Sequence, residues 1–241
     1  MRKQQWCHIG ILIVTIWCTA CLSMVAQIHA KQQKEVQQME EKTKNYIALS
    51  NDSMKDAIIF FGDSITEYCP IEDLYAQDMR ANIVLNRGIV SETTAMMKRR
   101  MQESVLILKP RSLVMLMGVN DLFAGVNQDE IVQNIKEMIQ MTKASSSQTQ
   151  IILQSIYPIN KEQRTTLAYR IHDRRIDNKK IRTVNKALKA LAEHEQIDYV
   201  DVYDILCDAS GNLKETYAFD GLHPNAKGYQ VVKEYLIDKL K

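Results

Sequence analysis

The chain has 241 residues, of which 46% are hydrophobic and 25% are charged, and its formal net charge is only +2. This composition is typical of an ordinary globular protein with one medium-sized core. With only 8 glycines and 4 prolines, a collagen-like or low-complexity chain is excluded. The near-neutral charge argues neither for a nucleic-acid-binding surface nor for an acidic tail.

The first thirty residues differ from the rest of the chain. Arg2 and Lys3 precede an uncharged run of 18 residues from Ile9 to Ala26, which would form a helix of about 27 Å. This is just short of a hydrocarbon core of about 30 Å, and longer than the apolar region of a cleavable signal, about 7–15 residues. Residues 1–30 therefore predict a signal anchor or a signal peptide cut after Ala30, with a lipoprotein signal at Cys21 as a third alternative.

All three alternatives send the remaining chain across a membrane, and the positive residues keep the N-terminus in the cytoplasm. We therefore expect an extracytoplasmic protein, either anchored by its N-terminal helix or secreted after cleavage. Polar residues 31–54 predict a stalk helix and linker, because Val36, Met39 and Tyr46 have helical spacing. Cys69 and Cys207 could pair in such a compartment or remain buried thiols.

Strand-like and helix-like segments alternate over residues 55–241. The predicted strands are 57–61, 81–86, 112–118, 150–156 and 198–203. The first four are nearly continuous apolar runs, which are typical of strands buried on both faces. Their alternation with helices implies right-handed crossovers and a parallel, doubly wound sheet.

Helical spacing of apolar side chains marks three of the connecting segments. The three sets are Ile131, Ile135 and Met138; Val184, Leu188 and Leu191; and Val232, Leu236 and Leu240. Asn127 and Glu130 have the spacing of a capping box in front of the first helix.

Four clusters of polar residues and glycine lie after predicted strands or before the last helix. They are "GDS" at 62–64, "NRGI" at 86–89, "GVND" at 118–121 and "DGLHPN" at 220–225. The carboxyl ends of parallel strands meet at one edge of the sheet, where ligands bind. We therefore expect the four clusters to converge there.

The residue types in these clusters suit acyl transfer. Such a reaction needs a nucleophile, a base held by an orienting group, and donors for the developing oxyanion. Ser64 could be the nucleophile, His223 the base and Asp220 its orienting group. The Asn120 amide, an unobstructed Gly88 N–H and the Ser64 N–H would be the oxyanion donors. Each residue alone reads as a cap or turn residue, so the prediction rests on their convergence.

The four clusters resemble the sequence blocks of the SGNH hydrolase superfamily, the GDSL-type esterases and lipases, over roughly residues 57–238. Stretches such as "QSIYPIN" at 154–160 resemble the branch related to platelet-activating-factor acetylhydrolases and bacterial carbohydrate and sialate O-acetylesterases. The resemblance implies an α/β fold, a three-layer α/β/α sandwich with about five parallel strands, as in flavodoxin-like proteins. It implies no metal and no cofactor.

The resemblance also implies roles for individual residues. The expected triad is Ser64, Asp220 and His223, and the expected oxyanion hole is Ser64, Gly88 and Asn120. Asp63, Gly62, Gly118 and Asp121 are expected to support these groups. The chain departs from the family pattern where Ser91 replaces a second glycine, and where Tyr217-Ala218-Phe219-Asp220 stands in place of the Tyr-Thr-x-Asp of many relatives. Both departures put the shape of the substrate pocket in doubt.

Other signals are weaker. The sequence contains no G-x-S-x-G, no P-loop and no H-E-x-x-H motif. A two-carboxylate glycosidase is not excluded by composition, although no spacing favours it. Residues 161–182 contain eight Lys or Arg against three acids, which could attract an anionic substrate or simply form a solvated helix face. His172 in this stretch is expected at the surface.

The sequence thus predicts an exported serine esterase that removes a short acyl group, with acetyl on a carbohydrate as the preferred substrate. Its expected partners are a small-molecule or glycan ester and, through the N-terminal segment, a membrane; nucleic acid is not expected, and the oligomeric state is open. The alternatives are a lysophospholipase or thioesterase with a longer acyl preference, a cell-envelope O-acyltransferase, and a non-catalytic glycan-binding surface protein.

Overall fold

The computed structural model describes residues 33–75, 78–79, 83–166 and 173–240, with residues 23, 26, 27 and 30. The signal segment predicted at 1–30 lies almost wholly outside this part of the chain, and so does His172. Within the part described, no helix is both long and apolar enough to cross a membrane. The chain divides into two compact units, residues 1–45 and 46–241. In the first unit, residues 33–45 are helical, as their spacing predicted.

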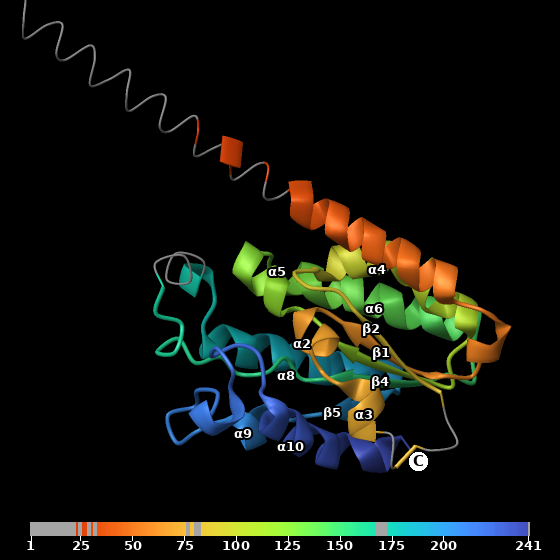
Figure 1. The fold of residues 1–241 in the computed structure, drawn as a ribbon. Helices are drawn as coiled ribbons and strands as arrows, with labels where there is room; N and C mark the ends of the chain where they lie inside the picture. Colours follow the sequence, from red (N-terminus) through yellow and green to blue (C-terminus); the bar gives the residue numbers. More distant parts are fainter. Residues whose placement is uncertain are drawn as a thin grey trace, which may run out of the picture. The chain divides into compact units, whose positions relative to one another are not determined.

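The second unit is built around a five-stranded parallel sheet (Figure 1). The strands are β1 (Ile58–Gly62), β2 (Val84–Gly88), β3 (Ser112–Leu116), β4 (Gln150–Gln154) and β5 (Asp198–Val200), in the spatial order β2-β1-β3-β4-β5. The predicted parallel sheet is therefore confirmed. Strand β2 ends two residues later than predicted, because pairing with β1 continues through the polar residues Asn86 and Arg87 as far as Gly88.

Helices cover both faces of the sheet, which confirms the three-layer α/β/α sandwich (Figure 1). They are α2 (Ser64–Glu67), α3 (Ile71–Tyr75), α4 (Thr94–Ser104), α5 (Val119–Ala124), α6 (Gln128–Ser145), α8 (Asn178–Glu195), α9 (Tyr203–Leu206) and α10 (Ala226–Leu236). Helix α6 packs against both α4 and α8, whereas α3 packs against α10. Short 3-10 turns are η1 (Asp52–Met54), η2 (Leu106–Leu108), η3 (Asp173–Arg175), η4 (Glu215–Tyr217) and η5 (Ile237–Lys239).

The core lies between the sheet and these helices. All nine apolar residues that marked the predicted helices are buried, and burying such a side chain contributes about 1.5–3 kcal/mol. Asn127 begins α6 as expected, because its side-chain oxygen accepts a hydrogen bond of 2.9 Å from the Glu130 N–H. Cys69 and Cys207 are free thiols, so the disulfide that the sequence left open is not formed.

Candidate active site

Ser64 lies where strand β1 turns into helix α2. A Cβ at Gly62 would collide with the Leu116 carbonyl oxygen on the neighbouring strand, so only glycine fits at the end of β1. Asp63 is the N-cap of α2, and its Oδ1 accepts a hydrogen bond of 2.9 Å from the Ile65 N–H. These two residues hold the turn that places the Ser64 side chain at the carboxyl edge of the sheet.

The structure brings together the three residues of the predicted triad. Ser64 Oγ lies 2.9 Å from His223 Nε2, and His223 Nδ1 lies 2.9 Å from Asp220 Oδ2. Ser64 and His223 are 159 positions apart in the sequence, so only the fold makes this contact. With Asp220 on Nδ1, Nε2 is left as the acceptor for the serine proton.

The loop after Asp220 is held by Asp220 itself. Its Oδ1 accepts hydrogen bonds from the backbone N–H groups of Leu222, at 3.0 Å, and His223, at 2.9 Å. Burial acts to raise the pKa of Asp220, but the hydrogen bonds from His223 and Leu222 outweigh it and hold this pKa well below its usual range. Asp220 is therefore ionised at neutral pH, which suits it to stabilise an imidazolium.

Gly221 has a φ of +81°, which favours glycine, and a Cβ there would collide with the Asn160 carbonyl oxygen. The Asn160 N–H in turn donates to the Gly221 carbonyl oxygen at 2.7 Å. The His223 loop is thus fastened to the segment that follows β4.

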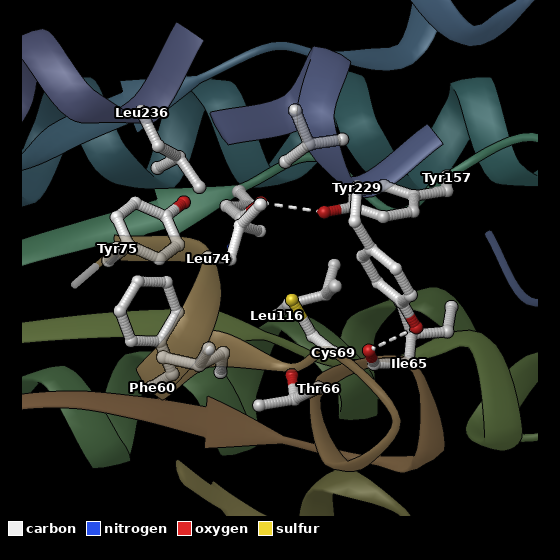
Figure 2. Close-up of a pocket in the computed structure, with 13 residues that line it drawn as sticks. Phe60, Ile65, Thr66, Cys69, Leu74, Tyr75, Leu116, Tyr157, Tyr229 and Leu236 are labelled. Atoms are coloured by element: carbon white, nitrogen blue, oxygen red, sulfur yellow. Dashed lines mark hydrogen bonds between the residues drawn. The ribbon is translucent and has the colours of Figure 1, made fainter. Parts of the chain in front are cut away.

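Two tyrosines that the sequence analysis did not single out support Ser64 and His223. The Tyr229 hydroxyl on α10 donates to the Ile65 carbonyl oxygen at 2.8 Å and so ties α10 to α2 (Figure 2). The Tyr68 ring lies 5.1 Å from the His223 ring in an edge-on arrangement. Neither residue belongs to a motif, and only the three-dimensional contacts reveal them.

A small cavity lies behind α2, lined by Ile65, Cys69, Tyr157 and Tyr229 among others (Figure 2). Its volume is about 20 Å³, which is room for about one water molecule. Burial raises the pKa of the Cys69 thiol to about 12, so this thiol stays protonated and is no competing nucleophile.

Two of the three expected oxyanion donors are available. Ser64 is the first residue of α2, and the first N–H groups of a helix have no acceptor within it. Asn120 lies in the first turn of α5, after Gly118, whose φ of +113° favours glycine. One Nδ2 proton of Asn120 goes to the Glu92 carbonyl oxygen at 3.0 Å, which leaves the second for a ligand.

The third donor differs from the expectation. The Gly88 N–H was expected to be unobstructed, but it donates to Asn86 Oδ1 at 2.9 Å. The Asn86 amide is fixed in this orientation because its Nδ2 donates to the carbonyl oxygens of Thr66, at 2.8 Å, and Cys69, at 3.1 Å. The Asn86 side chain therefore links the end of α2 to the end of β2. Its Oδ1 accepts the hydrogen bond that the Gly88 N–H was expected to donate to an oxyanion. The Gly88 carbonyl oxygen accepts from the Tyr46 hydroxyl at 2.9 Å.

Asp121 supports the Asn120 turn. Its two carboxylate oxygens accept from the Thr94 N–H, at 2.9 Å, and from the Thr94 hydroxyl, at 2.6 Å. This contact fixes the start of α4 against α5. Asp121 thus lies where the sequence placed a supporting residue, although it contacts neither Ser64 nor His223 through a hydrogen bond described here.

The model of the GDSL-like Lipase/Acylhydrolase family matches residues 60–231. The chain belongs to this family. It is therefore a carboxylic ester hydrolase, as predicted, and its fold matches that of the SGNH hydrolases.

Three individual proteins illustrate the relationship. A solved structure described as a candidate platelet activating factor from Streptococcus pneumoniae has a TM-score of 0.78 at 29% identity, covering 91% of this chain and 99% of that chain. The isoamyl acetate-hydrolyzing esterase of Saccharomyces cerevisiae is 25% identical over 209 residues, 76% of this chain and 84% of that protein. The N-acylneuraminate cytidylyltransferase of Escherichia coli is 26% identical over 195 residues, but these are only 41% of that protein.

The two departures from the family pattern now have a structural description. Ser91 has a φ of +65°, a left-handed conformation that a glycine adopts without strain. Phe219 is 80% exposed beside Asp220, and its N–H donates to the His223 carbonyl oxygen at 2.8 Å. A phenylalanine this exposed is unusual, because its ring gains stability only when it is removed from water.

The burial of Arg164 was not predicted from the sequence. We expected the basic stretch 161–182 at the surface or as an attractive patch, but Arg164 is buried in an ion pair with Asp173, at 2.6 Å. Its Nη1 also lies 4.0 Å from Asp220 Oδ2. A buried arginine needs such a partner, and the sequence does not reveal that Asp173, nine residues later, supplies it.

Asp63 is the most strongly perturbed acid beside Ser64. Burial raises the pKa of Asp63 to about 7, against the hydrogen bond from Ile65 that lowers it. Its Oδ2 is buried and has no hydrogen-bond partner among the described residues.

No group of three His, Cys, Asp or Glu side chains in the described part could hold a metal ion.

Proposed function

We propose that this GDSL-family hydrolase is an exported serine esterase that removes short acyl groups, with acetyl on a carbohydrate as the preferred substrate. One observation carries the serine mechanism: the continuous chain from Ser64 Oγ to His223 Nε2, at 2.9 Å, and from His223 Nδ1 to Asp220 Oδ2, at 2.9 Å. Such a chain activates a hydroxyl that is otherwise a weak nucleophile.

The proposed reaction has two halves. His223 Nε2 takes the proton of Ser64 while Oγ attacks the ester carbonyl, and the oxyanion binds the Ser64 N–H and the Asn120 amide. His223 then gives the proton to the departing alcohol, which leaves an acyl group on Ser64. A water molecule, deprotonated by His223, attacks this acyl-enzyme and releases the acid, and the proton returns to Ser64.

The short acyl group is supported by one of the relatives. The yeast relative, 25% identical to this chain, is named as an esterase that hydrolyses isoamyl acetate. An acetate ester favours acetyl over a long acyl chain, and hence an esterase over a lysophospholipase.

The carbohydrate as acyl acceptor is supported by two exposed aromatic rings at the triad. Tyr68, 54% exposed, lies against His223, and Phe219, 80% exposed, precedes Asp220. The electron-rich face of an aromatic ring attracts the weakly positive C–H bonds of a sugar ring. An acceptor stacked on the Tyr68 ring, which lies 5.1 Å from the His223 ring, would hold its ester near Ser64 Oγ.

Export is supported by the sequence alone. Arg2 and Lys3 followed by the apolar run Ile9–Ala26 favour a signal anchor or signal peptide. An extracytoplasmic acyltransferase would use the same residues with an alcohol in place of water, so product analysis distinguishes the two.

The test compares hydrolysis of p-nitrophenyl acetate, butyrate and octanoate by the full-length chain. We expect the rate to be highest with acetate and to fall at least 10⁴-fold in Ser64→Ala, because the nucleophile is lost. Ser210→Ala, at an exposed serine in the turn after α9, is the matched control and should keep the wild-type rate. Wild-type turnover in Ser64→Ala would refute the mechanism, and a preference for octanoate would refute the short acyl group.

A second comparison tests the acceptor. Phe219→Ala should raise KM for an acetylated sugar at least fivefold while leaving KM for p-nitrophenyl acetate within twofold. Equal changes for both substrates would contradict a sugar-binding role of the two rings.

A further inference from the structure

The segment that follows β4 turns at Asn160 and points Arg164 into the protein. Asn160 Oδ1 accepts a hydrogen bond of 3.1 Å from the Glu162 N–H. The Lys161 carbonyl oxygen accepts another of 3.1 Å from the Arg164 N–H. After this turn the Arg164 side chain is only 3% exposed. Because a guanidinium stays charged in a protein, the free energy lost when it leaves water must be offset by its neighbours.

The Arg164 guanidinium lies between two carboxylates. Its Nε donates to Asp173 Oδ2 at 2.6 Å and its Nη2 donates to Asp173 Oδ1 at 3.2 Å, so both oxygens hold the group. The third nitrogen, Nη1, lies 4.0 Å from Asp220 Oδ2. The guanidinium carbon also lies 5.5 Å from the centre of the Phe123 ring on α5. Arg164 is therefore fixed in place, with one nitrogen directed toward the proposed triad acid.

The Arg164 side chain also packs against the loop that carries Asp220. A Cβ at Gly221 would lie only 3.1 Å from Arg164 Cγ. The Gly221 carbonyl oxygen accepts a hydrogen bond of 2.7 Å from the Asn160 N–H. The turn that begins at Asn160 therefore contacts the residue next to Asp220 through both its backbone and its arginine side chain.

The two oxygens of the Asp220 carboxylate have different neighbours. Oδ1 accepts hydrogen bonds from two backbone N–H groups of its own loop. Oδ2 lies 2.9 Å from His223 Nδ1 and 4.0 Å from Arg164 Nη1. A distance of 4.0 Å is too long for a hydrogen bond, but an opposite charge this close favours the ionised carboxylate. Arg164 can therefore attract Oδ2 without displacing His223.

We propose that Arg164 is a positioning residue for the esterase reaction, whose charge holds the ionised Asp220 carboxylate toward His223. This inference rests on the proposed serine mechanism. In the alternative role, Arg164 serves Asp173 alone and only closes the chain between them, where Lys161 Nζ also donates to the Asp173 carbonyl oxygen at 2.9 Å. The two roles differ in one consequence, because only the first makes the effect of Arg164 depend on the charge of Asp220.

A double-mutant cycle in the full-length chain tests this dependence. Arg164→Met keeps an unbranched apolar stem, and it should lower kcat for p-nitrophenyl acetate about tenfold with KM within twofold, because neither Arg164 nor Asp220 is proposed to bind the substrate. In an Asp220→Asn background, Arg164→Met should change kcat less than twofold, because a residue that acts through Asp220 has no further effect once that charge is gone. Ser64→Ala gives the background rate.

A second readout does not depend on residual turnover. The proton in the hydrogen bond between His223 Nδ1 and Asp220 gives a proton NMR signal far downfield of the amide signals. Arg164→Met should move this signal upfield or remove it. Asp173→Asn breaks the ion pair but leaves the cation beside Asp220, so this variant should keep the signal and lose less than threefold in kcat.

Arg100→Met is the matched control for the loss of a buried cation. Arg100 is 5% exposed and pairs with Glu92 at 2.7 Å, so this variant also leaves a buried acid unpaired. It should lower the free energy of unfolding, as Arg164→Met does, but keep the downfield signal. Circular dichroism and thermal unfolding give the folded fraction to which each kcat is referred. Where Arg164→Met does not fold, Arg164→Lys takes its place in the cycle, with an expected loss of about threefold in kcat because the charge is kept without the fork.

Three results would overturn the proposal. One is an equal loss of kcat from the Arg164 variant in the wild type and in Asp220→Asn, which would give Arg164 a purely structural role. Another is a loss from Asp173→Asn as large as that from the Arg164 variant. The third is an unchanged downfield signal in the Arg164 variant. The serine mechanism is tested separately, because turnover retained in Ser64→Ala would refute it whatever Arg164 does.

Discussion

The two halves of the candidate active site differ in how far they are arranged for the reaction. On one half, Ser64, His223 and Asp220 form an unbroken hydrogen-bonded chain. On the other half, the Gly88 N–H is already bonded to Asn86, and one proton of the Asn120 amide is bonded to Glu92. The half that is proposed to move protons is complete, whereas the half that would stabilise the oxyanion has fewer free donors than the motifs predict.

The largest expected effect comes from breaking the complete half. His223→Ala should lower kcat/KM for p-nitrophenyl acetate about 10⁴-fold or more, because the base that activates Ser64 is lost. Steady-state kinetics measure this loss. His194→Ala, at an exposed histidine on α8, is the matched control and should leave kcat/KM unchanged. A loss below tenfold in His223→Ala would mean that another group deprotonates Ser64.

A smaller effect is expected in the other half. Asn120→Ala should lower kcat by about 10²–10³-fold with little change in KM, since this donor acts mainly on the transition state. The loss in kcat should approach 10³-fold if the Gly88 N–H stays bonded to Asn86 during turnover, because the Asn120 amide and the Ser64 N–H are then the only two donors to the oxyanion. Asn127→Ala removes a capping amide from α6 and controls for lost stability. An unchanged kcat in Asn120→Ala would remove it from the oxyanion hole.

Asp63, beside the nucleophile, should affect stability more than rate. Its folded pKa of about 7 lies above the usual value near 3.8, so the folded state binds this proton more tightly than the unfolded state. The stability from this proton is fully present below the unfolded pKa near 3.8, is lost between there and about pH 7 with a slope of up to about 1.4 kcal/mol per pH unit, and changes no further above pH 7. Urea unfolding between pH 5 and 9 measures the slope.

The control for this effect is Asp63→Asn, which keeps an oxygen acceptor for the Ile65 N–H but cannot ionise. The difference in unfolding free energy between wild type and Asp63→Asn should shift in favour of the variant as pH rises. A difference that stays constant with pH would show that Asp63 is ionised throughout.

The smallest effect concerns the link between β2 and α4. Ser91→Gly should raise the free energy of unfolding by about 0.5–1 kcal/mol, because relief of the left-handed strain exceeds the entropy that glycine adds to the unfolded chain. Thermal unfolding measures it. Ser146→Gly, where φ is −155°, offers no such relief and should destabilise; a similar change at both sites would argue against strain at Ser91.

The sequence predicted the sheet, and which residues meet at its edge, for one physical reason. Buried parallel strands are nearly continuous apolar runs, and the groups that follow them are brought to one edge by the topology. The positions of Ser64, His223 and Asp220 follow from that rule together with the family blocks. Their catalytic roles stay predictions until the variants are measured.

The sequence could not predict which polar groups are already bonded to one another. The contact from Asn86 to Gly88 spans two residues, but its orientation depends on carbonyl oxygens at the end of α2. The burial of Arg164 depends on Asp173 in the same way. Such pairings are set by packing between elements, and no periodicity or motif records them.

The groups that surround Ser64 come from distant parts of the sequence. His223 follows Ser64 by 159 residues, and Tyr229, whose hydroxyl holds α10 against the helix of Ser64, follows Ile65 by 164 residues. A ribosome therefore makes the proposed nucleophile long before its proposed base. A growing chain interrupted between the two carries Ser64 without His223, so the proposed ester cleavage begins only after His223 has been made and has folded against Ser64.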